Sequence, residues 1–299
     1  MAKVSDHLRQ LYVEKITPYR TVIEAILKQE KQQLLLLQQD PQNVAFKRLA
    51  LAEDMLKLTS YYIILNGVSV SVLKVKNEDA LNEARQSLYK SIIYLEQVVT
   101  GFVDVGFSEY EDKMEEIITL DSAQRYSLVC KLGFIVQLLE NAYGDNTKWK
   151  WSFVDLEGRC AAVTKNLLDM KNIVANMDFR SPNYEPTMYH LKLVRKLLSQ
   201  AADRYREKYE LSTNQIDDYR RGIDFLGALK RILIVMGGDK DEVEDVQKKM
   251  DIWNAKLEMD LRNAKLEMDS KNAKLEMDSR NAKLEMDNRN RQEIHPNKE

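Results

Sequence analysis

The sequence has few of the residues that interrupt or cross-link a chain: 10 glycines, 5 prolines and 2 cysteines among 299 residues. This composition excludes collagen-like and low-complexity chains, and a hydrophobic share of 44% excludes a wholly disordered one. The cysteines, Cys130 and Cys160, lie inside apolar helical patterns without CxxC spacing. We therefore expect buried free thiols, not redox or zinc chemistry. The length suggests roughly two domains, or one domain with an extension.

An excess of charge of either sign is also missing. Lysine and arginine number 45 against 47 aspartates and glutamates, which gives a formal net charge of -2. Because no positive field draws in phosphate backbones, nucleic acid is not an expected main partner. The sequence therefore excludes a strongly basic, nucleic-acid-coating protein.

Residues and motifs that carry common chemistry are scarce as well. The three histidines, His7, His190 and His295, are far apart, and neither His7 nor His190 has a Glu or His one helical turn away. GxGxxG, GxxxxGK[ST], GxSxG and HExxH motifs do not occur. We therefore predict no catalytic residue, no metal site and no cofactor. Missing motifs weaken the case for an enzyme without excluding one.

No apolar run is long enough to suggest a membrane span. The longest uncharged stretch, residues 58–73, contains Ser60, Asn66 and Gly67 and is shorter than the roughly 18 to 20 apolar residues that cross a bilayer. The N-terminal region reaches Asp6 and Arg9 before any apolar stretch, unlike a secretory signal. We therefore expect a cytoplasmic protein and do not expect a membrane as its partner.

Apolar residues instead recur at spacings of three and four, as in helices that bury one face. Asp121 with Gln124 has capping-box spacing, and Gly144 and the pair Gly237-Gly238 are natural helix ends. These signals predict an all-α protein whose body, residues 1–238, is an antiparallel bundle of about seven helices. The stripes run from Ala84 to Val99, Leu128 to Ala142, Val163 to Met177, Leu191 to Tyr205 and Ile216 to Leu226.

One segment of the body has a competing pattern. Residues 61–65 are followed by Asn66-Gly67 and then by valines that alternate with serines to residue 72. This order is typical of two strands joined by a two-residue turn, so it predicts a small β-hairpin near residues 61–75. A lone hairpin in a helical chain is marginally stable, and a helix remains the alternative.

The C-terminal region carries a tandem repeat. The sequence Asn-Ala-Lys-Leu-Glu-Met-Asp occurs four times at a nine-residue period, beginning at Asn254, Asn263, Asn272 and Asn281. Ala, Lys, Leu, Glu and Met are strong helix formers, and neither Gly nor Pro interrupts residues 239–295. We predict one long helix over residues 239–295, with the repeats at 254–289 and a disordered end at 296–299.

The nine-residue period gives this helix two apolar stripes. At about 100° per residue, nine residues rotate the pattern by about 900°, so successive copies face opposite sides. Two copies complete 18 residues in five turns, which favours nearly straight packing. The first stripe is Leu257, Ala264, Met268, Leu275, Ala282 and Met286, and the second is Ala255, Met259, Leu266, Ala273, Met277 and Leu284.

These features favour a non-enzymatic scaffold protein. The two-striped helix would associate with itself, giving a homo-oligomer, or with another helical protein. The alternative for the helix is a solvated rod whose stripes are too narrow to hold a partner. The alternative for the protein is a small-molecule-binding or enzymatic bundle with the repeat as a passive tail.

A possible ligand patch in the body would serve this second alternative. It consists of Lys148, Trp149, Lys150 and Trp151, where cations beside aromatic rings could stack on or bind an anionic ligand. Tryptophans at a helix start more commonly pack into the core while neighbouring lysines face solvent.

Overall fold

The computed structural model describes residues 5–40, 42–144 and 147–294, and side chains as far as residue 283. The described residues form helices and connecting segments without a strand, which confirms the all-α prediction. The chain divides into two compact units, Met1–Val246 and Gln247–Glu299. The end expected to be disordered, residues 296–299, lies outside the described residues.

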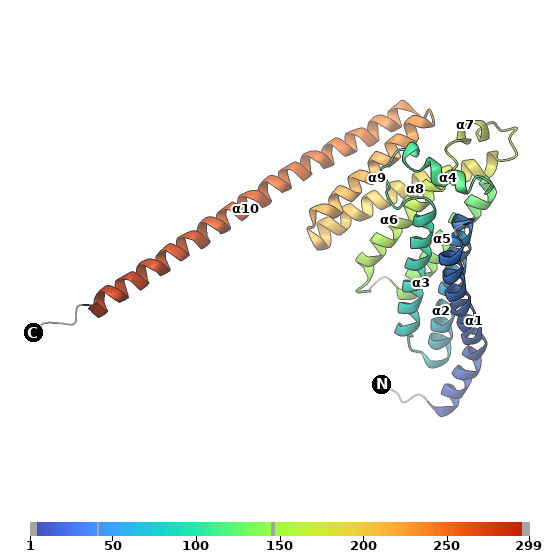
Figure 1. The fold of residues 1–299 in the computed structure, drawn as a ribbon, viewed down its shortest axis with the longest axis horizontal. Helices are drawn as coiled ribbons and strands as arrows, with labels where there is room; N and C mark the ends of the chain where they lie inside the picture. Colours follow the sequence, from blue (N-terminus) through green and yellow to red (C-terminus); the bar gives the residue numbers. More distant parts are fainter. Residues whose placement is uncertain (1–4, 41, 145–146, 295–299) are drawn as a thin grey trace, which may run out of the picture. The chain divides into compact units, whose positions relative to one another are not determined.

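Seven long helices make up most of the first unit, in line with the number expected (Figure 1). Short connections join α1 to α2 and α2 to α3, so these neighbours run antiparallel. Shorter helical segments are η1 (Phe107–Glu109), α4 (Glu111–Glu116), α7 (Ile173–Asn176) and the π-helical η2 (Tyr209–Thr213). The long helices are α1 (Asp6–Gln39), α2 (Val44–Leu73), α3 (Glu78–Val98), α5 (Ser122–Tyr143), α6 (Lys150–Asn166), α8 (Tyr184–Lys208) and α9 (Ile216–Val235).

The main core lies where α2, α3, α5 and α6 meet. The predicted stripes of α3 and α5 are the buried faces, with Leu88, Ile92 and Leu132 fully enclosed. A second cluster joins α1 to α2 through Ile16, Met55 and neighbouring residues. On the other side of the bundle, α8 packs against α5, α6 and α9. The central helix α6 therefore contacts α3, α5 and α8, and the clefts described below lie beside these contacts.

The predicted hairpin is wrong, because residues 61–73 form the last turns of α2. The local β pattern is outweighed by packing and by hydrogen bonds to the turn that follows the helix. The Asn77 N–H donates to Asn66 Oδ1 at 2.9 Å, and Ser69 Oγ donates to the Val75 carbonyl at 2.8 Å. The polar side chains that interrupt the apolar run are thus satisfied inside the bundle.

Two other boundary predictions had different outcomes. Asp121 and Gln124 form the predicted capping box, with the Gln124 N–H 2.7 Å from Asp121 Oδ1 and the Asp121 N–H 3.0 Å from Gln124 Oε1. The stripe from Val163 to Met177 is not one helix, because a turn separates α6 from α7. In that turn Asp169 accepts hydrogen bonds from the Asn172 backbone and side chain, an arrangement that competes with helix continuation.

The long C-terminal helix, α10, spans Lys240–Ile294, and the boundary between the two units falls inside it. Gly237 has a φ of 61°, which supports the turn after α9. Asp239 Oδ1 accepts from the Asp241 N–H at 3.1 Å at the helix start. Arg195 of α8 forms an ion pair with Glu242, which fixes the first turn of α10 to the body.

Among the described residues, α2 is long and apolar enough to cross a membrane by length and composition. Of the 18-residue window that meets this criterion, 33% is buried inside the structure. Core helices of soluble proteins meet the same criterion, and α2 packs against α1, α3 and α5. The finding is therefore weak support for a membrane span.

Candidate functional site

The repeat of α10 presents both of its apolar stripes to solvent. Apart from Leu257, the described large apolar side chains of the two stripes are exposed, from 56% at Met259 to 67% at Leu275. Leu257 is half-buried, whereas Leu266, Met268 and Met277 are exposed, as are Ala255, Ala264, Ala273 and Ala282. The side chains of Leu284 and Met286 lie outside the described residues. Because helical rotation sets the two stripes about 180° apart, the helix offers two separate apolar faces.

Charged side chains flank these faces. Lys256 Nζ lies 3.1 Å from Asp260 Oδ2, which makes an ion pair between residues one helical turn apart. Each copy of the repeat carries Lys, Glu and Asp in the same order, so both flanks carry charges of both signs. A helix lying antiparallel along either face could oppose lysines to glutamates, as charged flanking positions do in coiled coils.

The segment Lys148 to Trp151 packs at the start of α6. Trp149 is partly buried against the main core, and the Arg85 guanidinium lies 4.1 Å from its ring centroid. Lys150 Nζ lies 4.8 Å from the centroid of Trp151, and both lysines are exposed. None of these four residues lines either of the two large clefts of the body. Trp149 therefore packs on the main core, Trp151 is half-buried, and the two lysines lie at the surface.

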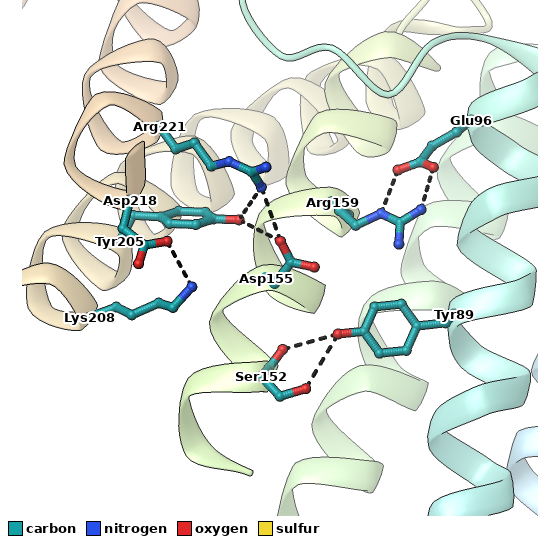
Figure 2. A network of polar contacts seen from close by, with 9 residues as sticks. All are labelled: Tyr89, Glu96, Ser152, Asp155, Arg159, Tyr205, Lys208, Asp218 and Arg221. Atoms are coloured by element: carbon teal, nitrogen blue, oxygen red, sulfur yellow. Dashed lines mark hydrogen bonds and ion pairs between the residues drawn. The ribbon is translucent and has the colours of Figure 1, made fainter. Parts of the chain in front are cut away.

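The first of these clefts, which we call the polar cleft, has a volume of about 720 Å³ and lies among α3, α6, α8 and α9. Figure 2 shows the polar network beside it, contributed by side chains from these four helices. Arg159 is bound by both oxygens of Glu96, at 2.8 and 2.5 Å. Arg221 Nη1 and the Tyr205 hydroxyl both donate to Asp155 Oδ1, at 3.1 and 3.2 Å.

Each arginine of this network already has a carboxylate partner, so the network holds helices together. Burial and the neighbouring Asp155 raise the pKa of Tyr205, which keeps its phenol protonated as a donor. Tyr205 also packs directly on α6, because a Cβ on Gly158 would lie 2.6 Å from Tyr205 Cε2. Only glycine allows this approach of α8 to α6.

Side chains at the end of α6 fix the loop that borders the polar cleft. Lys165 Nζ donates to the carbonyls of Val103 and Val105, each at 3.0 Å. Asn166 Nδ2 donates to the carbonyls of Thr100 and Phe102, at 2.8 and 3.0 Å. Burial lowers the pKa of Lys165 to about 8. These bonds give an irregular segment the backbone partners that a helix would supply.

The second cleft, which we call the apolar cleft, has a volume of about 730 Å³ and lies between α5, α6 and α8. Glu140 of α5, Glu157 of α6 and Arg204 of α8 meet at its wall. No spacing motif in the sequence predicts this cluster, because its members are far apart in the chain. The only sign of the cluster in the sequence is that each of the three helices carries a charged residue beside its apolar stripe.

The cysteines and histidines show no metal-binding arrangement within the described part of the chain, which holds no group of three or more His, Cys, Asp or Glu side chains suited to an ion. His190 is buried, its Nε2 lies 2.9 Å from the Thr164 carbonyl, and burial lowers its pKa to about 4. Cys160 is a buried free thiol as expected, whereas Cys130 is partly exposed. Burial raises the pKa of Cys160 to about 12, which keeps this thiol neutral.

The described residues define an all-α protein, a bundle of long helices followed by one long repeat-bearing helix. Residues 8–261 match the TP0443 family, and the chain belongs to this family. No curated protein and no solved structure matches the sequence. The family match includes the repeat motif that begins at Asn254 but ends before those beginning at Asn263, Asn272 and Asn281.

Proposed function

We propose that this protein is a non-enzymatic cytoplasmic scaffold whose repeat helix associates with a second copy of the chain or with another helical protein. The observation that carries the proposal is the exposure of two opposite apolar stripes along α10. Contiguous exposed apolar surface is a common mark of interaction sites. The mixed charges on both flanks suit another helix better than a nucleic acid or a lipid surface.

The stripes require several copies to act together. Each copy offers one leucine, one methionine and one alanine, and burial contributes only about 0.8 kcal/mol per methylene. Association first has to offset several kcal/mol of lost translational and rotational freedom. A straight helix with a period of about 3.6 residues keeps each stripe in line, so contacts can add along its length.

The test is the molar mass of the full chain by light scattering across protein concentration. We expect concentration-dependent association that the double substitution Leu266→Asp with Leu275→Asp abolishes, because it places one carboxylate on each stripe. The matched control is Asn263→Asp with Asn272→Asp, which adds the same charge between the stripes. Equal association of both double variants would contradict the proposal. A wild-type chain that stays monomeric removes self-association and leaves only a different helical protein as partner.

A pair of deletions tests the role of the stripes directly. Deleting nine residues, 263–271, rotates the remaining repeats by about 180°, which exchanges the stripes and keeps both continuous. Deleting eight residues, 263–270, rotates them by about 80° and breaks both stripes. We expect the first variant to retain most of the association and the second to lose it. The reverse order would show that the stripes are not the contact surface.

A further inference from the structure

The apolar cleft has walls that suit an aliphatic group. Val129, Val136, Leu193 and Leu197 line it from α5 and α8. Gly133 of α5 also lines the cleft, and a Cβ at this position would meet no atom within 4 Å. The space beside Gly133 is therefore open and not filled by a neighbouring helix. A volume of about 730 Å³ lies within the range of small-molecule sites.

Three ionisable side chains, Glu140, Glu157 and Arg204, converge at the wall of this cleft. Arg204 Nε lies 3.1 Å from Glu157 Oε2, and Arg204 Nη2 lies 3.4 Å from Glu157 Oε1. Arg204 Nη1 also donates to Glu207 at 3.4 Å. Because Arg204 is held by two carboxylates, its charge is already neutralised. The carboxyl group of Glu140 faces Glu157 without an arginine of its own.

Glu140 is left with unused hydrogen-bonding capacity. Its Oε1 is buried and has no hydrogen-bond partner among the described residues. Burial, followed by the hydrogen bond and the charge of Glu157, raises the pKa of Glu140 to about 8, while Arg204 opposes the rise. The other charged residues at the cleft are Lys196 and Asp203 of α8. At neutral pH the carboxyl group of Glu140 is therefore mostly protonated.

We infer that the apolar cleft binds an amphiphilic primary ammonium ion, with the ammonium group at Glu140 and Glu157 and the alkyl chain along the valine and leucine wall. The N–H groups of the ligand supply the donor that Glu140 Oε1 lacks. On binding, the proton of Glu140 leaves for solvent and the ammonium takes its place. One positive charge enters and one leaves, so the local charge is unchanged.

Ligands of other charge fit this site less well. An anion would meet two carboxyl groups, while the arginine is already engaged by Glu157 and Glu207. A neutral alcohol would leave the proton of Glu140 in place and would offer Glu140 only one weaker, uncharged donor. Charge complementarity therefore separates a primary ammonium ion from its alcohol and carboxylate counterparts.

The experiment is isothermal titration calorimetry of the full chain with octylammonium, 1-octanol and octanoate at pH 7. Repeating the octylammonium titration in two buffers of different ionisation enthalpy measures the protons released. We expect octylammonium to bind with release of nearly one proton, and at least tenfold tighter than 1-octanol or octanoate. The affinity should fall about tenfold for each pH unit below 8, because protons compete for Glu140.

Two variants locate the binding. Glu140→Gln should weaken octylammonium binding at least tenfold and abolish proton release. Gly133→Met fills the open space of the cleft and should weaken binding severalfold, whereas Gly67→Met, at an exposed helical glycine of α2 that also has open space, should not. The inference is overturned if octylammonium does not bind, if 1-octanol binds equally well, or if neither Glu140→Gln nor Gly133→Met weakens binding. None of these outcomes depends on association through α10.

Discussion

The body and the repeat helix achieve order by different means. In the body, helices far apart in sequence share a core, and ion pairs such as Glu96–Arg159 join α3 to α6. In the repeat, the structure is decided by neighbouring residues and the apolar side chains face outward. The family match covers the body and one repeat motif only. The body is therefore specified by irregular, long-range contacts, and the repeat by local helix preference alone.

Substitution of a buried arginine of the body should cause the largest loss of unfolding free energy that separates the two regions. Arg125 donates to the carbonyls of Leu120, Ile117 and Leu167 at 2.8, 3.0 and 3.3 Å. Arg125→Met leaves these buried acceptors unpaired and should lower the free energy of unfolding by about 3 to 5 kcal/mol. Urea denaturation measures the change. Arg262→Met, on the exposed part of α10, should change the free energy of unfolding by less than about 0.5 kcal/mol. Equal losses for the two variants would contradict the stated difference between the body and the repeat helix.

A leucine from each region gives the next contrast. Leu132 is fully buried in the main core, and Leu132→Ala should cost about 2 to 5 kcal/mol through lost burial and the cavity left behind. Leu275 is 67% exposed, and Leu275→Ala should stay within about 0.5 kcal/mol. Chemical denaturation at a concentration where the chain is monomeric measures both. A large loss for Leu275→Ala under those conditions would show that the repeat packs within its own chain.

Acid should destabilise the body through His190. Its pKa is lowered to about 4 in the folded state, whereas an unfolded histidine titrates near pH 6.5. Between these values the unfolded chain binds the extra proton, so stability falls as the pH drops from 6.5 to 4, by roughly 2 to 3 kcal/mol. His190→Gln keeps a donor for the Thr164 carbonyl but does not titrate. The difference in unfolding free energy between the two proteins should therefore change across this pH window, and a constant difference would refute the assignment.

The smallest contrast compares two helical glycines within the body. Gly158→Ala would force Tyr205 away from α6 and should cost about 1 to 3 kcal/mol. Gly133→Ala meets open space and should be neutral or stabilising by up to about 1 kcal/mol, because alanine favours a helix. Thermal unfolding of both variants distinguishes the two environments. Equal stability would mean that Tyr205 moves aside without loss of packing.

Periodicity allowed much of the fold to be predicted, since the stripes of α3 and α5 became buried faces and Asp121 capped α5 as its spacing indicated. The hairpin near Asn66 failed because a local β pattern carries no information about the bonds that Asn66 and Ser69 make to the following turn. The apolar cleft was out of reach for a similar reason. Glu140, Glu157 and Arg204 converge only through the rotation and tilt of three helices, which one sequence does not encode in a readable spacing.

The period of the repeat has a consequence for evolution and for engineering. At about 1.5 Å per residue, one nine-residue copy lengthens α10 by about 13.5 Å. Because the half-turn between copies exchanges equivalent stripes, gain or loss of a whole copy changes reach while the chemistry of both faces stays the same. Tandem duplication or deletion of whole copies would therefore change the length of α10 in fixed steps. No new contact surface would have to be selected after each change.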